Sequence, residues 1–128
     1  MKTMNHLGIL TIMVLGLLAI CNTSCTYEDL IKPKVEVPDS VSFNVNIIPI
    51  FNSSCNVAGC HAKGGIPPNL SEADAYTTLI FFGYVDPEIP AEENELYDKI
   101  NTGSMRQYAT DQDRALILSW IEQGALDN

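Results

Sequence analysis

Basic residues are scarce in this sequence. Seven lysines and arginines stand against sixteen aspartates and glutamates, and the formal net charge is -9. All sixteen acids but only six of the bases lie after residue 25, so that part of the chain carries about ten negative charges. Nucleic-acid binding needs basic surface, so this composition predicts no nucleic-acid partner. The acidic balance instead favours a soluble surface and a positively charged protein partner.

Long apolar runs, strand-like alternation and internal repeats are also missing. The one extended apolar stretch, residues 7–20, is shorter than the ~20 residues that a membrane-spanning helix needs. It follows Lys2, and a positive start before a short apolar run is typical of an export signal. The rest of the chain lacks the period-two pattern and the Asn-Gly turns of strands and hairpins. The sequence therefore predicts an exported, all-α protein.

Two cysteines, Cys21 and Cys25, close the apolar run. A signal that ends in cysteine resembles the lipobox of bacterial lipoproteins, in which the cysteine becomes the acylated first mature residue. The small Ser24 before Cys25 suits the processing peptidase, so we predict a signal peptide at 1–24 and lipidation at Cys25. Lipidation at Cys21 and ordinary secretion without a lipid remain alternatives. The expected location is the bacterial cell envelope, anchored to a membrane on the periplasmic or cell-surface side.

Residues 25–40 combine prolines and charges with few large apolar side chains. This composition suits an extended tether that holds a domain away from a membrane. The folded domain is therefore expected at 41–128.

Apolar spacing and end signals predict four short helices in this domain, at 43–51, 71–80, 92–101 and 111–123. Pro49 suits a first turn better than a helix interior, so the first helix is either weak or split into two pieces. Residues 52–54, Asn-Ser-Ser, are expected to end it, and Ser71 is expected to cap the second helix. Glycines and prolines predict long loops at 62–69 and 83–90.

The last helix has the clearest start. Thr110 and Asp113 have the spacing of a capping box, and Gly124 ends the apolar pattern. Because apolar residues occupy more than one side, we expect this helix to be the most buried one. Four short helices with long loops still make a thin core, which small domains commonly supplement with a disulfide, a metal or a cofactor.

Residues 55–61, Cys-Asn-Val-Ala-Gly-Cys-His, carry the clearest chemical signal. Two nearby thiols can form thioether bonds to the vinyl groups of a haem, and a histidine directly after the second thiol can lie under the iron. The usual attachment run has two residues between the cysteines, whereas this one has four. The extra residues can bulge away from the porphyrin edge, with Gly59 taking an unusual backbone angle.

Three other uses of these thiols are open. Cys55 and Cys60 could form a disulfide in an exported protein. A zinc site would need carboxylates as further ligands, because no cysteine follows Cys60 and His61 is the only histidine after the signal. A thioredoxin-like redox pair lacks both the spacing and a strand–helix unit.

The part of the chain after the signal offers one histidine and one methionine as axial ligands of the iron. His61 would be the proximal ligand, with its other ring nitrogen donating to a backbone carbonyl, most naturally in the Pro67-Pro68 loop. Met105 is the only methionine after the signal, and Met/His ligation favours electron transfer over oxygen binding. Each also has a plainer interpretation, His61 as a surface histidine and Met105 as a packing residue. Arg106 would either pair with a haem propionate or remain a solvated charge.

The order of these motifs resembles the small class I cytochrome c domains of planctomycetes and Bacteroidetes. The resemblance covers about residues 41–126 and is most specific at the Cys-Cys-His run and at Trp-Ile-Glu-Gln-Gly-Ala, residues 120–125. The sequence departs from that family in the longer cysteine spacing and at residues 104–106, where a Gly-Met-Pro-like turn is frequent. The resemblance implies a class I cytochrome c-like fold around one haem, with the first and last helices crossing. Residues expected to meet there are Phe43, Ile47 and Phe51 with Leu116, Trp120 and Ile121.

The expected function is that of a lipid-anchored monohaem cytochrome c, which exchanges single electrons with redox protein partners outside the cytoplasm. One covalently attached haem c is the cofactor, held by Cys55, Cys60, His61 and Met105. No catalytic acid–base pair is visible, so we expect neither enzymatic activity nor a small-molecule substrate. Two alternatives are a haem-based sensor or ligand binder, and a haemless interaction module stapled by a disulfide.

Overall fold

A computed structural model describes residues 35–128. The predicted signal peptide, the lipid-bearing Cys25, its alternative Cys21 and most of the tether lie outside the described residues. The described part of the chain forms four α-helices and three short helical turns, without a strand. This confirms the all-α prediction. No helix in residues 35–128 has the length and apolarity needed to cross a bilayer.

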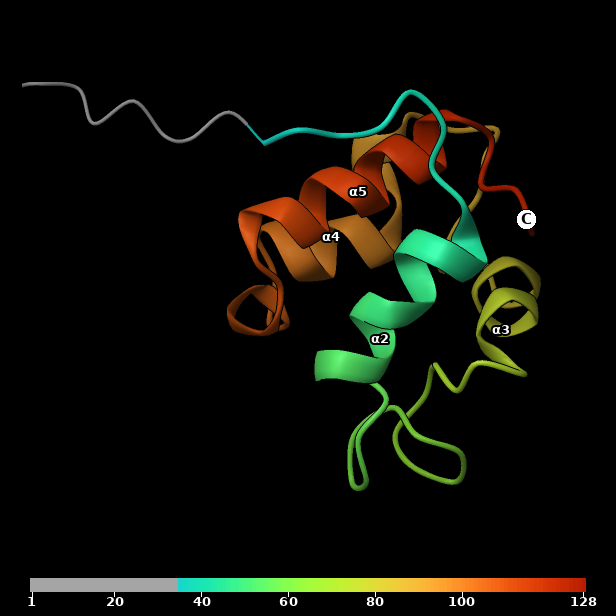
Figure 1. Cartoon of the computed structure of the whole chain (residues 1–128). Helices are drawn as coiled ribbons and strands as arrows, with labels where there is room; N and C mark the ends of the chain where they lie inside the picture. Colours follow the sequence, from blue (N-terminus) through green and yellow to red (C-terminus); the bar gives the residue numbers. More distant parts are fainter. Residues whose placement is uncertain (1–34) are drawn as a thin grey trace, which may run out of the picture. The chain divides into compact units, whose positions relative to one another are not determined.

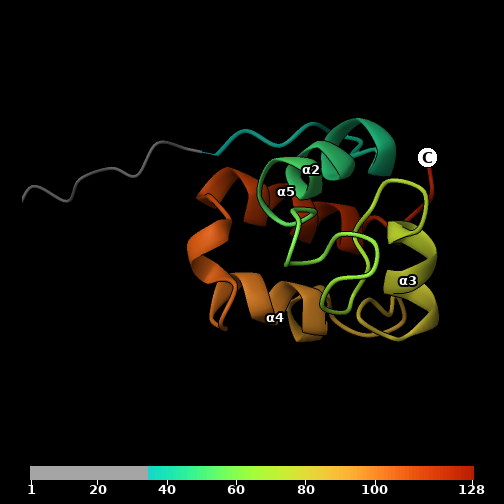
Figure 2. The same ribbon diagram turned by 90° about the horizontal axis from the view of Figure 1, so that it is seen from below.

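The elements follow one another along a chain with long connections. They are the π-helical turn η1 (Phe43–Ile47), α2 (Ile48–Ser54), α3 (Ala75–Phe81), the 3-10 turn η2 (Ala91–Glu93), α4 (Glu95–Asn101), the 3-10 turn η3 (Arg106–Tyr108) and α5 (Asp111–Glu122). Helices α4 and α5 pack against each other, and η1 packs on α5 (Figure 1). The loop after α2 lies below the helices in Figure 1, and in the view from below it is in front of them, with α3 at one end (Figure 2).

The core is centred on aromatic side chains from the first and last elements. The ring centroids of Phe43 and Trp120 lie 5.0 Å apart, and Phe43 also meets Phe51 and Tyr76 edge to face at 6.3 and 5.3 Å. Ile47 and Ile121 are buried in the same cluster. The expected contact between the first and last helices is therefore confirmed at this cluster. Its residues supply much of the apolar burial that stabilises so small a domain.

The first predicted helix is divided into two pieces, η1 and α2. This division was one of the two outcomes expected from the position of Pro49. Pro49 lies in the first turn of α2, where its missing N–H costs no hydrogen bond. The predicted end at residue 51 is wrong, because α2 continues to Ser54. The hydroxyls of Ser53 and Ser54 donate to the Ile50 carbonyl at 2.8 and 3.2 Å instead of breaking the helix.

The predicted start of the second helix is also wrong, since α3 begins at Ala75 with Asp74 as its N-terminal flanking residue. The Ser71 hydroxyl, expected to cap the helix, instead donates to Asp74 Oδ2 at 3.1 Å. The Asn69 amide donates to the same oxygen at 2.9 Å. This side-chain network makes residues 71–74 a separate turn before the helix.

A buried asparagine divides the predicted helix at 92–101 into η2 and α4. Asn94 has an extended backbone angle and is 1% exposed. Its side-chain oxygen accepts from the Asp86 N–H at 2.6 Å, and its amide donates to the carbonyls of Pro90 and Ala91 at 3.2 and 3.3 Å. Asn94 therefore ties the preceding loop to the start of α4.

Helix α5 begins as predicted. The Thr110 hydroxyl accepts from the Asp113 N–H at 3.1 Å, and the Asp113 carboxylate accepts from the Thr110 N–H at 2.8 Å. The expectation that this helix is the most buried one is met only in part. Ile117, Trp120 and Ile121 are buried, but the remaining apolar residues of α5 are only half-buried, whereas three of the seven residues of α2 are buried.

The described residues that precede 41 lie against α5. The Glu36 carbonyl accepts from the Gln112 side-chain amide at 2.9 Å, and Val37 packs on the core. Gln123 accepts the Val41 N–H at 2.8 Å. At the other end of the chain, the Asn128 carbonyl accepts from the Asn44 N–H at 2.9 Å.

Candidate functional site

The Cys–His loop, residues 55–61, leaves the C-terminal end of α2. The Cys55 N–H still donates to the Phe51 carbonyl at 2.9 Å, so the first thiol is placed by the last turn of the helix. Cys55 is half-buried and Cys60 is exposed, and both are free thiols. The helix therefore fixes one sulfur, while the other lies on the loop.

Backbone hydrogen bonds close this loop on itself. The Cys55 carbonyl accepts from the Val57 N–H at 2.9 Å and from the His61 N–H at 3.1 Å, and the Cys60 N–H donates to the Val57 carbonyl at 2.9 Å. Residues 57–60 are exposed, and Gly59 has a φ of 84°, which favours glycine. The unusual backbone angle predicted for Gly59 is confirmed, and the loop returns His61 to the Cys55 carbonyl.

The His61 ring is held by two backbone carbonyls. Its Nδ1 lies 3.0 Å from the Ile66 oxygen and 3.1 Å from the Pro68 oxygen. Carbonyl oxygens only accept hydrogen bonds, so Nδ1 carries a proton, and in the neutral ring the lone pair is then on Nε2. The expected hydrogen bond from His61 to the Pro67-Pro68 loop is confirmed. This arrangement is the one that orients a metal-binding histidine.

The segment that supplies these carbonyls, residues 62–70, is itself tied to the Cys–His loop. The Ile66 N–H donates to the Cys60 carbonyl at 2.7 Å, and the Leu70 N–H donates to the His61 carbonyl at 2.8 Å. A Cβ atom at Gly65 would lie 2.3 Å from the Cys60 carbonyl oxygen, so the two backbones approach as closely as only glycine allows. The adjacent glycines at 64 and 65 were a signal of this approach, which the sequence analysis used only to place a loop.

Burial raises the pKa of the Cys55 thiol above its ordinary value. The Ser54 hydroxyl, 3.7 Å from the sulfur, opposes this shift, while the Asp113 carboxylate and the Cys60 thiol add to it. The thiol is therefore protonated at neutral pH. The influence of Asp113 also places the start of α5 near the first sulfur.

Met105 comes from a different part of the chain, the segment 103–109 between α4 and α5, which we call the Met105 segment. Met105 is half-buried and packs against the core, and its N–H donates to the Lys99 carbonyl at 2.9 Å. Within the described residues, no hydrogen bond joins this segment to the Cys–His loop. The structure thus brings Cys55, Cys60 and His61 together and leaves Met105 on a separate element.

Apolar groups surround the Cys–His loop without being covered. Val57 and Ile66 are 44% and 61% exposed, and Phe82 is 68% exposed. A cavity of about 270 Å³ lies beside the loop, lined by Ala62, Gly64, Gly65, Pro67, Pro68, Asn69, Thr78, Phe82 and Tyr84. In residues 35–128, no three histidine, cysteine, aspartate or glutamate side chains gather as a metal cluster.

Comparison with known proteins gives no match to this chain among protein-family models, curated proteins or solved structures.

Proposed function

We propose that Cys55, Cys60 and His61 hold one covalently attached haem, and that the protein is a lipid-anchored monohaem cytochrome c of the class I type. A haem bound in this way supplies one iron that alternates between the ferrous and ferric states. The protein then carries single electrons between redox proteins outside the cytoplasm, anchored through Cys25 in the cell envelope. It needs no acid–base residues and no small-molecule substrate.

The single observation that carries the proposal is the hydrogen bonding of the His61 ring. Two carbonyls accept from Nδ1 and so select the neutral tautomer whose lone pair is on Nε2, the nitrogen that would bind iron. Two carbonyls on one ring nitrogen fix the orientation of the ring, as is typical of a metal-binding histidine. The loop also keeps His61 hydrogen-bonded to the Cys55 backbone, despite the four residues between the cysteines.

The two thiols, the exposed apolar side chains near them and Met105 also fit a haem. Two free thiols flank the loop, one on a helix end and one exposed, as two thioether bonds to a single porphyrin would require. Uncovered apolar side chains at Val57 and Ile66 lie on the same loops and suit a large apolar ligand. Met105 is the available second axial ligand, because thioether sulfur ligates haem iron and raises its reduction potential.

A pyridine haemochrome spectrum combined with intact mass tests the proposal. The mature protein is coexpressed with cytochrome c maturation machinery, and we expect the mass of one haem and the spectrum of two thioether bonds. The variant C60A should show a one-thioether spectrum, and the double variant C55A/C60A should bind no haem covalently. Ser53→Ala serves as a control on the same helix end, and its haem content should equal that of the wild type.

The contrary outcomes are equally clear. A wild-type protein that lacks covalent haem under these conditions contradicts the proposal. If its mass also reveals a disulfide between Cys55 and Cys60, the haemless interaction module is the correct interpretation. Carbon monoxide separates the sensor from the carrier, because a carrier with both axial positions filled binds it slowly.

A further inference from the structure

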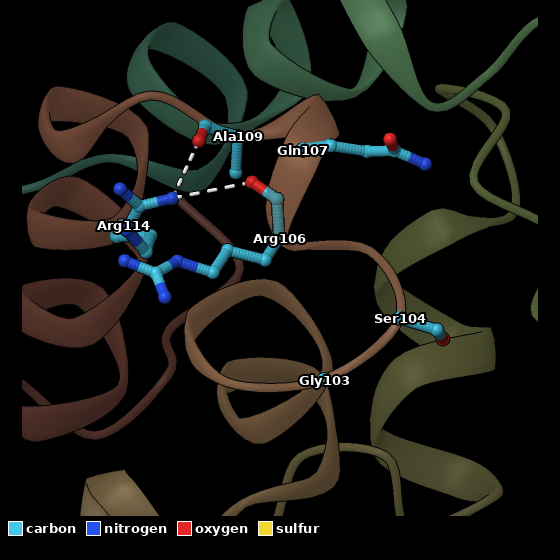
Figure 3. A pocket seen from close by; sticks show the side chains of 6 residues that line it. All are labelled: Gly103, Ser104, Arg106, Gln107, Ala109 and Arg114. Carbon is cyan, nitrogen blue, oxygen red and sulfur yellow. Dashed lines mark hydrogen bonds between the residues drawn. The ribbon is translucent and has the colours of Figure 1, made fainter.

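The two arginines of the chain, Arg106 and Arg114, line the same cavity. The cavity has a volume of about 500 Å³, and its other lining residues are Gly103, Ser104, Gln107 and Ala109 (Figure 3). Small-molecule sites typically enclose about 300–1,000 Å³. None of the residues proposed to hold haem lines this cavity, so it is a separate feature of the Met105 segment.

Arg114 forms a fixed wall of the cavity. Its side chain is 14% exposed, and one guanidinium nitrogen donates to the carbonyls of Ala109 and Arg106 at 2.5 and 3.3 Å (Figure 3). The other nitrogen pairs with the Asp111 carboxylate. The positive charge of Arg114 is therefore balanced, and its donors are used to hold the backbone of the Met105 segment.

Arg106 is the positively charged side chain that remains available to bind a ligand. Residues 35–128 contain fourteen acids and only four bases. Lys63, Lys99 and Arg114 each pair with an acid, but no described residue forms an ion pair or a side-chain hydrogen bond with the Arg106 guanidinium. In a part of the chain so rich in carboxylates, the base without an ion-pair partner among the described residues lines this cavity.

The side chains of Ser104 and Gln107 point away from the two guanidinium groups, which lie together on the other side (Figure 3). Ser104 and Gln107 are exposed, and neither side chain has a hydrogen-bond partner among the described residues. A guanidinium presents a planar fork of N–H groups that matches the two oxygens of a carboxylate or phosphate.

We propose that this cavity binds the oxyanion group, carboxylate or phosphate, of a free small molecule. The negative charge of the rest of the protein does not prevent this, because charges further than about 10 Å away are largely screened at 0.1 M salt. Asp111, at the start of α5, is already paired with Arg114. No lining residue is one of the proposed haem ligands, and the inference takes Arg106 as a solvated charge that is not paired with a haem propionate.

The test uses NMR on the full mature protein in its reduced state. Because the chain has two arginines, its spectrum contains two arginine Nε–Hε signals, which can be assigned with R106Q. Inorganic phosphate and succinate are titrated separately against chloride at constant ionic strength. We expect saturable shifts of the Arg106 signal and of the backbone amides of the Met105 segment with at least one of the two anions.

Two variants sharpen the result. R106Q should weaken binding about tenfold or more, the scale of a lost charged hydrogen bond. K99Q is the matched control, since Lys99 is a base on neighbouring α4 that does not line the cavity, and its affinity should be unchanged. Shifts that grow linearly without saturation, equal affinity in R106Q, or no response to either anion would overturn the proposal, whether or not haem is bound.

Discussion

At His61, the sequence predicted the chemistry and the structure supplied the geometry. The sequence indicated a ring nitrogen donating to a carbonyl near Pro67-Pro68, because prolines offer carbonyls without competing N–H groups. It did not indicate that Ile66 would share this role, since its carbonyl reaches the ring only through the path of residues 62–70. A bifurcated hydrogen bond depends on that backbone path, which no residue type specifies.

Gly65 is the residue whose replacement should disturb this site most directly. In Gly65→Ala, the new Cβ would meet the Cys60 carbonyl oxygen at 2.3 Å and the Ala62 oxygen at 3.0 Å, so the two loops must separate. We expect a loss of about 2 kcal/mol in the free energy of unfolding, together with reduced haem attachment. Urea unfolding and the haemochrome yield measure these two effects.

Gly64→Ala is the matched control for this change. Gly64 has a φ of 81° but no atom near its ideal Cβ position, so the variant carries backbone strain of about 1 kcal/mol without a collision. Haem attachment should be close to normal in this variant. Equal losses in both variants would mean that the contact of Gly65 with Cys60 does not position the site.

Cys55 should show a pH dependence in the haem-free, reduced protein. Burial raises the pKa of its thiol, so the thiolate that reacts with iodoacetamide forms only at a higher pH than for an ordinary cysteine. The folded state keeps the proton more tightly than the unfolded state does. The resulting stability is full below the ordinary thiol pKa and is lost as the pH rises through the raised value.

Mass spectrometry of alkylation against pH measures this effect, and urea unfolding at neutral and alkaline pH measures the linked stability. Ser54→Ala is the informative companion variant, because it removes the hydrogen bond that lowers the pKa and should shift the Cys55 profile further upward. An alkylation profile identical to that of a free thiol would contradict the prediction.

At the scale of elements, a helix end was predicted well where a local pair of side chains decides it. Thr110 and Asp113 form their capping box because both groups lie within one turn. Ser71 is not a cap, because Asn69 and Asp74 draw it into another network. Asn94 divides a predicted helix because its side chain forms hydrogen bonds with backbone groups of the 86–91 loop. These groups come within reach of Asn94 only when the chain folds.

Arg114 links α5 to the Met105 segment, and we expect it to act as a positioning residue for Met105. Arg114→Met keeps an apolar stem but removes the donors to the Arg106 and Ala109 carbonyls. If Met105 ligates the iron, its bond should weaken, so the reduction potential should fall and carbon monoxide should bind the reduced protein about tenfold faster or more. Potentiometry and carbon monoxide kinetics measure these changes.

Two variants calibrate that result. Met105→Leu removes the sulfur and defines the full effect, while Arg106→Gln alters the neighbouring arginine but leaves the carbonyl that Arg114 holds. We expect Arg114→Met to lie between these two. A variant that loses stability without any change in potential or in carbon monoxide binding would mean that Arg114 has only a structural role.

For the molecule as a whole, charge should govern encounters with partners. The described residues carry fourteen acids and four bases, so a cationic redox protein should be attracted over distances of about a Debye length. Electron exchange with such a partner should slow on the order of tenfold between low and high salt. Stopped-flow rates against ionic strength measure this, and a neutral small redox reagent should show little change. A rate that rises with salt would contradict the acidic docking surface.

The sequence by itself determined the helical class, the acidic surface, the helix ends with local caps, and the residues of the Cys–His loop, because composition and short-range spacing are enough to specify these features. Only the tertiary structure decided which carbonyls hold His61, how closely Gly65 approaches Cys60, and that both arginines share one cavity. These depend on segments that approach each other only when the chain folds around the Phe43–Trp120 core. The physical reason is that a hydrogen bond or a cavity wall requires atoms placed to within a few tenths of an ångström, and packing alone fixes positions that closely.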